Sequence, residues 1–153
     1  MVTVDDVRTA RARISGRVRR TPLLQAGPEL WFKLEFAQYA GSFKTRGMVN
    51  RMLAAGRLPE AGVVAASGGN AGLAAAYAAA ELGVPAEVFV PLTAPPVKVA
   101  KLGKLGARVV QVGDEYAEAY AAAAVHAETT GALFCHAYDF WNFEKQNYFL
   151  KNL

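Results

Sequence analysis

The fold is decided by residues 63–82, which read VVAASGGNAGLAAAYAAAEL. The first four residues form a short apolar run of the kind found in buried strands, and two glycines follow in a turn. Residues 70–82 are mostly alanine, the strongest helix former, and Gly83 stands where helices commonly end. The stretch therefore predicts a strand, a glycine turn and a helix in direct succession.

The same unit repeats toward the C-terminus. Further strands are predicted at residues 86–90, 107–112 and 133–136, with helices at 97–105 and 114–129 between them. Pro95 and Pro96 precede the first of these helices and Gly106 follows it, as helix ends prefer. Strands that alternate with helices predict an α/β fold, namely a parallel four-stranded sheet with helices on both faces.

The chain before residue 61 follows a different pattern. A helix is predicted over residues 4–14 with Thr3 as its N-cap, an extended segment over 20–24, a strand over 30–35 and a helix from Lys44 to Ala55. Three segments are therefore expected: residues 1–60, an α/β domain at 61–139, and a tail at 140–153. The tail has three asparagines, whereas residues 1–139 have two, and its apolar positions allow an amphipathic helix.

Composition limits the classes of function. The 153 residues are 53% hydrophobic and 20% charged, which indicates a globular chain. Cys135 is the only cysteine and is expected to be a small buried apolar residue, and His126 and His136 have no ligand cluster around them, so no metal site is predicted. No apolar run is long enough to span a membrane and no signal peptide is recognisable, so a cytoplasmic location is expected.

Part of the net charge of +4 comes from arginines crowded into residues 8–20. Such a cluster could serve an anionic partner, but arginines on a first helix more often form a solvated face, so no nucleic acid is expected to bind. The arginines of this cluster are Arg8, Arg11, Arg13, Arg17, Arg19 and Arg20.

Lys44 lies in an unusual place, within residues 41–47, GSFKTRG. It stands between a Gly-Ser turn and a predicted helix, beside Phe43. Burial against an aromatic ring would lower the pKa of the lysine and make its amine a nucleophile. The alternative is a solvated lysine paired with a carboxylate at the start of the helix. Arg46 is interpreted as a structural cation.

The turn from Ser67 to Gly72 joins a strand end to a helix start. Exposed N–H groups and the helix dipole favour an anion there, and Gly68 and Gly69 would let a ligand approach the backbone closely. In the alternative interpretation, Ser67 or Asn70 simply caps the helix.

Five motifs occur in one order: RTPL at 20–23, FKLE at 32–35, GSFKTRG at 41–47, SGGNAG at 67–72 and VPLTAP at 90–95. Together they resemble the N-terminal half of the fold-type II pyridoxal-phosphate enzymes, within the group of threonine/serine dehydratases and serine racemases. The resemblance runs from about Arg19 to Asp139. It implies that residues 61–139 are the small domain of that fold and that residues 1–60 are part of the large one.

The resemblance also implies site residues. Lys44 would form the Schiff base with pyridoxal 5'-phosphate, Phe43 would pack near the cofactor ring, and Asn70 would hydrogen-bond the ring hydroxyl. The carboxylate of a small amino-acid substrate would lie on Ser67, Gly68, Asn70 and Ala71.

The implied activity is that of a lyase, which eliminates the β-hydroxyl of a hydroxy-amino acid and yields a 2-oxo acid and ammonia. A homo-oligomer is expected. Two alternatives stay open: another type II activity, either a racemase or a β-replacement synthase, and a non-catalytic remnant domain that oligomerises or docks on a complete homologue.

The chain departs from the group at Ala71, Gly72 and Leu73, where His, Ala and Gln are common. The glycine-rich loop that holds the cofactor phosphate in the group, and the Ser or Cys that contacts the pyridine nitrogen, would lie beyond residue 153. A truncated chain with weak cofactor binding and little turnover is therefore expected. An imine absorption band at stoichiometric cofactor would contradict this expectation.

Overall fold

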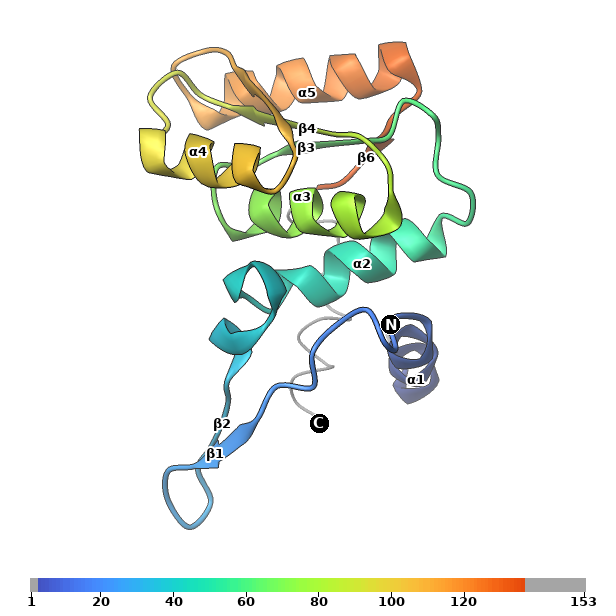
Figure 1. The fold of residues 1–153 in the computed structure, drawn as a ribbon, viewed down its shortest axis with the longest axis vertical. Helices are drawn as coiled ribbons and strands as arrows, with labels where there is room; N and C mark the ends of the chain where they lie inside the picture. The colour runs from blue at the N-terminus through green and yellow to red at the C-terminus, as the bar shows by residue number, and fades with distance from the viewer. Residues whose placement is uncertain (1–2, 137–153) are drawn as a thin grey trace.

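A four-stranded parallel sheet lies at the centre of the computed structural model, which describes residues 3–136 (Figure 1). The predicted tail lies outside the described residues. The strands stand in the order β5–β4–β3–β6, and each adjacent pair is parallel. Their bounds are Val63–Ala66 for β3, Ala86–Val90 for β4, Arg108–Gln111 for β5 and Leu133–Phe134 for β6.

Helices cover both faces of this sheet. Val63, Ala65 and Val88 point into one core, which α3 (Asn70–Leu82) and α4 (Pro96–Lys104) cover. Val64 and Phe89 point into the other, which is closed by α5 (Tyr116–Thr130). Because side chains alternate along a strand, both faces are apolar, and this confirms the predicted fold class.

The alanines of α3 explain how the first core closes. Five of them, Ala74, Ala75, Ala76, Ala78 and Ala79, are at most 1% exposed. Small side chains let the helix lie close to the sheet on one side and to another helix on the other. That second helix is α2 (Lys44–Ala54), whose Met48, Val49 and Met52 belong to the same core.

The chain reverses its direction of travel across the sheet after β5. From β3 it moves outward through β4 to β5, and α5 then returns it to β6 on the far side of β3. The point between β3 and β6 is therefore a topological switch point. In open α/β sheets, ligands bind at such points, outside the carboxyl ends of the strands.

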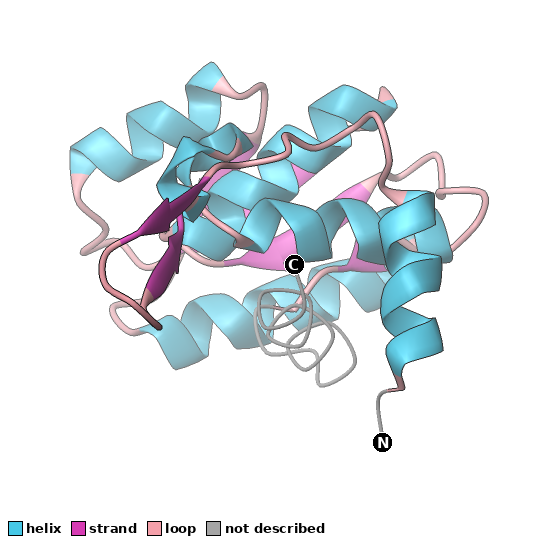
Figure 2. Cartoon of the chain, turned by 90° about the horizontal axis from the view of Figure 1, so that it is seen from below, coloured by secondary structure: helices cyan, strands magenta, loops and turns pink. Residues whose placement is uncertain are grey.

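The N-terminal segment lies beyond α2, away from the sheet (Figure 1). It comprises α1 (Val4–Arg13), an antiparallel hairpin of β1 (Leu23–Gln25) and β2 (Trp31–Lys33), and two short 3₁₀ turns, η1 (Glu35–Ala37) and η2 (Tyr39–Gly41). Thr3 caps α1 in a capping box with Asp6, as expected for the N-cap. Figure 2 shows the hairpin standing out at one side of the molecule.

Three predicted strands are shorter than expected, and one of them, predicted over 107–112, loses a residue at each end. The strand predicted over 30–35 ends at Lys33, because Glu35 starts η1 and turns its carboxylate to the buried Arg46. The strand predicted over 133–136 ends at Phe134, although the Cys135 N–H still donates to the Val64 carbonyl. Cys135 itself is 1% exposed, which confirms the prediction of a buried residue.

Within residues 3–136, no helix is long and apolar enough to cross a membrane. The same residues contain no group of three or more His, Cys, Asp or Glu side chains that could hold a metal ion.

Candidate active site

Two helices begin at the same end of the molecule. Figure 1 shows α2 and α3 side by side and running in the same direction, and both start at the edge where the sheet strands end. Lys44 is the first residue of α2 and Asn70 is the first residue of α3. The turn that leads into α3 directly follows β3, one of the two strands at the switch point. The fold thus brings the two predicted halves of the site to one edge.

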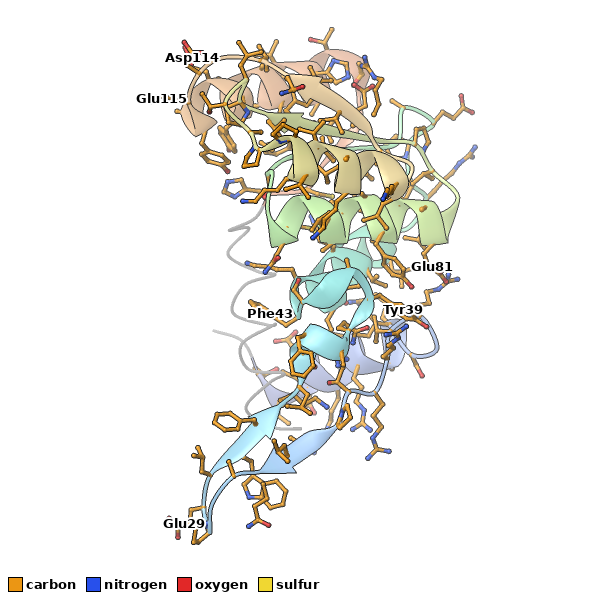
Figure 3. The ribbon with its side chains drawn as sticks, turned by 60° about the vertical axis from the view of Figure 1, so that its left-hand side comes forward. Glu29, Tyr39, Phe43, Glu81, Asp114 and Glu115 are labelled. Carbon is orange, nitrogen blue, oxygen red and sulfur yellow. The ribbon has the colours of Figure 1, made fainter. Side chains whose placement is uncertain are left out.

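Lys44 is half-buried, and burial lowers the pKa of its amine. Its Nζ lies 5.3 Å from the centre of the Phe43 ring, close enough for a cation–π contact. Phe43 and Tyr39 lie on opposite sides of the segment that leads into α2 (Figure 3). The predicted environment of Lys44, an aromatic ring and partial burial, is what the structure has. A lowered pKa raises the share of neutral, nucleophilic amine at neutral pH.

The turn before α3 leaves the first N–H groups of that helix without a side-chain cap. Gly69 is the N-cap residue, and the Ser67 Oγ accepts from the Gly69 N–H at 3.2 Å, one step before the helix. Asn70 is exposed and Ala71 is buried, with 6% of its surface exposed. Ser67 thus closes the turn, as one interpretation expected, but neither Ser67 nor Asn70 caps the helix. Uncapped N–H groups at a helix start favour an anion.

The three glycines of this turn differ in what the fold requires. A Cβ on Gly72 would lie 1.9 Å from the Ser67 carbonyl oxygen, so packing alone demands glycine there. On Gly68 and Gly69, a Cβ would find no atom closer than 3.6 Å and 3.8 Å, and neither residue has a left-handed φ. No neighbour within the described chain explains these two glycines, which is consistent with space kept for a ligand.

One further polar atom lies near Lys44. Ser42 is 5% exposed, and its Oγ has no hydrogen-bond partner among residues 3–136. Buried hydroxyls are normally paired, so an unpaired one calls for an explanation. This hydroxyl, the Lys44 amine with its lowered pKa, the adjacent Phe43 ring and the open turn are the groups that pyridoxal phosphate would meet here. These residues fit the aldehyde and ring side of that group.

A buried polar network links three of the motifs and was not predicted. Arg46 donates to both carboxylate oxygens of Glu35, at 2.9 Å and 2.8 Å, and to Thr21 Oγ1 at 3.1 Å. The Thr21 hydroxyl also donates to the Glu35 carboxylate. The three residues are 3–9% exposed. This confirms that Arg46 is a structural cation, and it fastens α2 to the N-terminal segment.

The network also sets the charge of its carboxylate. Burial by itself raises the pKa of Glu35, but hydrogen bonds from Arg46 and Thr21, together with the charge of Arg46, outweigh it and lower the pKa overall. Glu35 is therefore ionised at neutral pH. One sign of this network was present in the sequence, because Thr21, Glu35 and Arg46 each lie in one of the five motifs.

A comparison with known proteins adds the family. The family model "Pyridoxal-phosphate dependent enzyme" matches residues 14–149, which includes most of the segment predicted as an atypical tail. The chain is 42% identical over 141 residues to the L-threonine ammonia-lyase of Geobacter sulfurreducens, covering 87% of this chain and 35% of that protein. It is 38% identical over 150 residues to that of Thermotoga maritima, covering 91% of this chain and 37% of that protein.

The fold has close counterparts among solved structures. The structure of maize serine racemase matches with a TM-score of 0.86 and 31% identity, over 97% of this chain and 48% of that one. The chain spans about a third of the length of these two curated relatives. The lysine, the glycine turn and the family match agree, and the chain belongs to the pyridoxal-phosphate dependent enzyme family.

Proposed function

We propose that this chain carries the lysine and the substrate-carboxylate turn of a pyridoxal-phosphate-dependent ammonia-lyase that acts on threonine or serine. The observation that carries the proposal is the common edge at which α2 and α3 begin. It supports a site in which the amine of Lys44 and the open N–H groups before α3 face one ligand. Two of the relatives described above are L-threonine ammonia-lyases.

Lys44 is the residue proposed to move the proton. Its amine, whose pKa burial lowers, would bind the cofactor aldehyde before the substrate arrives and take the Cα proton afterwards. Phe43 would shield one side of the amine from water. An amine held in one place in this way would transfer the proton only at Cα of the substrate.

The turn from Ser67 to Ala71 is proposed to orient the substrate. The N–H groups at the start of α3, which have no side-chain cap, would donate to the substrate carboxylate, and the Asn70 amide would donate to the ring hydroxyl of the cofactor. Gly68 supplies the space for the approach. Because these contacts use mainly backbone N–H groups, the substitutions at positions 71–73 leave them in place.

The cofactor, when bound, supplies a ring that takes up the negative charge left on Cα when the proton departs. In the net reaction, threonine or serine loses the α-proton and the β-hydroxyl as water, and hydrolysis then gives a 2-oxo acid and ammonia. A racemase or a β-replacement synthase would use the same lysine and the same turn, and the match to maize serine racemase keeps the first of these open. The cytoplasmic location remains a prediction.

A second candidate function is docking without catalysis, and the β1–β2 hairpin favours it. Trp31, Phe32 and Leu24 are 50–54% exposed on a two-stranded sheet that has no third strand among the described residues. Isolated hairpins are marginal, and exposed apolar patches mark interfaces. The predicted homo-oligomer would form through this surface. Trp31→Ser should then lower the mass measured by light scattering, whereas Val125→Ser, at an exposed site on α5, should not.

The enzyme proposal is tested by trapping. The chain is incubated with excess pyridoxal phosphate, reduced with borohydride and digested, and the modified lysines are found by mass spectrometry. Excess cofactor is needed because weak binding is expected. Preferential modification of Lys44 over the exposed lysines is the expected result, and modification of all lysines in proportion to their exposure would contradict the proposal.

Three variants control this experiment. Lys44→Ala should abolish the selective product, and Lys101→Ala, which removes an exposed lysine from α4, should leave it unchanged. Gly68→Ala should weaken competition by an amino acid for the site, so that more of the Lys44 product remains when the amino acid is present. Equal yields in all three variants would assign the labelling to general surface chemistry.

A further inference from the structure

The arginine cluster of residues 8–20 divides in two in the folded chain. Arg8 pairs with Asp5 at 2.9 Å, Arg13 donates to the Asn50 side chain at 2.7 Å, and Arg17 lies 3.7 Å from Glu81. These three arginines therefore have protein partners. The other three, Arg11, Arg19 and Arg20, line a cavity of about 540 Å³ between α1, β2 and the start of the hairpin.

Two more cations reach the same cavity, Lys33 from β2 and Arg46 from α2, and no Asp or Glu is among the described residues that line it. Glu35 neutralises Arg46 in the buried pair, so four positive charges remain. Arg19 lies over the Tyr39 ring at 4.3 Å and donates to the Ala37 carbonyl, neither of which is an anion. Among residues 3–136, Arg11 and Arg20 have no ion pair.

Lys33 shows how close these charges are. Its Nζ donates to the Thr21 carbonyl at 2.7 Å, which fixes the amine at the cavity wall. Burial lowers the pKa of Lys33, and the charges of Arg46 and Arg20 lower it further, against the opposite effect of Glu35. An anion between these groups would relieve the repulsion.

We propose that this cavity binds a small phosphate-class dianion between Arg11, Arg20 and Lys33. Its volume is within the range of small-molecule sites, and arginine forks suit the geometry of phosphate oxygens. Ser15, which also lines the cavity, adds a hydroxyl donor. The site is separate from Lys44 and from the turn before α3, and it does not rest on the proposed activity.

The test is a calorimetric titration of the chain with inorganic phosphate at constant ionic strength. Saturable binding of one phosphate per chain is expected, and an Arg11→Gln/Arg20→Gln variant should lose about tenfold or more in affinity, because each charge-assisted hydrogen bond contributes that much. The charge-matched control, Arg8→Gln/Arg17→Gln, removes two arginines of the same segment that do not line the cavity. It should bind phosphate as the parent does.

An equal loss of phosphate affinity in both double variants would overturn the proposal, since it would show attraction to net charge alone. Titrations that never saturate would overturn it too. Folding is followed in parallel: phosphate should raise the Tm of the parent and of the control, and not that of the Arg11→Gln/Arg20→Gln variant. A second titration with glycerol phosphate separates the sources, because tighter binding than inorganic phosphate would indicate an organic monoester.

Pyridoxal phosphate carries a phosphate too, which allows a further check within the trapping experiment. Lys33 should be modified as a second product, and added inorganic phosphate should suppress it while leaving the Lys44 product. Suppression of both products together, or of neither, would contradict a separate phosphate site. The Lys44→Ala variant should keep the Lys33 product, so failure of the enzyme proposal and failure of this one are distinguishable.

Discussion

Arg46 holds Glu35 through two parallel hydrogen bonds, Nε to Oε2 at 2.9 Å and Nη2 to Oε1 at 2.8 Å. Their side chains are only 7% and 10% exposed, so the pair is shielded from water. Arg46 lies two residues after Lys44, in the first turn of α2. The ion pair therefore fixes the helix that carries the candidate catalytic amine to the segment that precedes it.

The first prediction is that Glu35→Ala lowers the free energy of unfolding by about 3–5 kcal/mol, because it leaves the Arg46 guanidinium buried without its anion. Asp5→Ala, which breaks the exposed pair with Arg8, should cost no more than about 1 kcal/mol. Urea denaturation of both variants measures the difference. Similar losses in the two variants would show that the buried pair has no special role.

The second prediction concerns acid. The pKa of Glu35 is lower in the folded chain than its ordinary value of about 4.3, which we take for the unfolded chain. The stability that ionised Glu35 contributes is therefore fully present above the unfolded-chain pKa, and it is lost as the pH falls through the pKa of Glu35 in the folded chain. Between pH 5 and 3 (roughly the range in which carboxyls titrate), the parent should lose more stability than Glu35→Gln. Parallel curves for the two proteins would refute this, since all other carboxyls are shared.

The sequence predicted local features well and long-range ones poorly. The helix over 70–82 was predicted to the residue, because an alanine run ends at Gly83, whose left-handed φ of 71° suits a C-cap. The pairing of Glu35 with Arg46, 11 residues on, and of Thr21 with both depends on how the hairpin folds back. No periodicity in the sequence encodes that pairing, so the strand predicted over 30–35 is longer than the strand in the structure.

The same division applies to the candidate site. A lysine beside a ring and an open turn before a helix are local, and both were predicted. Lys44 and Asn70 begin two parallel helices that pack together, which is a feature of the tertiary structure. The motifs implied it only through their resemblance to the enzyme family. The exposed hairpin, with Glu29 at its far tip in Figure 3, follows from chain packing, and so does the cavity in which half of the arginine cluster, predicted as a solvated face, comes together.

The third prediction tests the environment of Lys44. Burial lowers the pKa of Lys44. The rate at which its amine reacts with an acylating reagent should therefore rise at a pH below the ordinary lysine pKa of about 10.4. Phe43→Ala removes the ring that lies 5.3 Å from Nζ and admits water; the loss of burial, which is what lowers the pKa, should outweigh the loss of the cation–π contact, so the rise should move back toward that value. Mass spectrometry follows each lysine separately. Identical profiles for Lys44 in the two proteins would mean that the ring does not shield the amine.

The fourth prediction separates glycines that the fold needs from glycines that a ligand needs. Gly72→Ala should lower the free energy of unfolding by about 1–3 kcal/mol, because its Cβ would meet the Ser67 carbonyl oxygen at 1.9 Å. Gly103→Ala, in α4 with nothing within 4 Å of the new Cβ, should instead gain up to about 1 kcal/mol from helix propensity. Thermal and urea unfolding measure both changes.

Gly69→Ala completes this set, because it separates binding from folding. Its Cβ would have only Ser67 Oγ near, at 3.8 Å, so the free energy of unfolding should change by no more than about 0.5 kcal/mol. If the open N–H groups before α3 hold a substrate carboxylate, the same methyl group should obstruct it, and competition by an amino acid in the trapping experiment should weaken. A variant that is as stable as the parent and shows undiminished competition would remove the turn from the site, while Lys44 would stay in it.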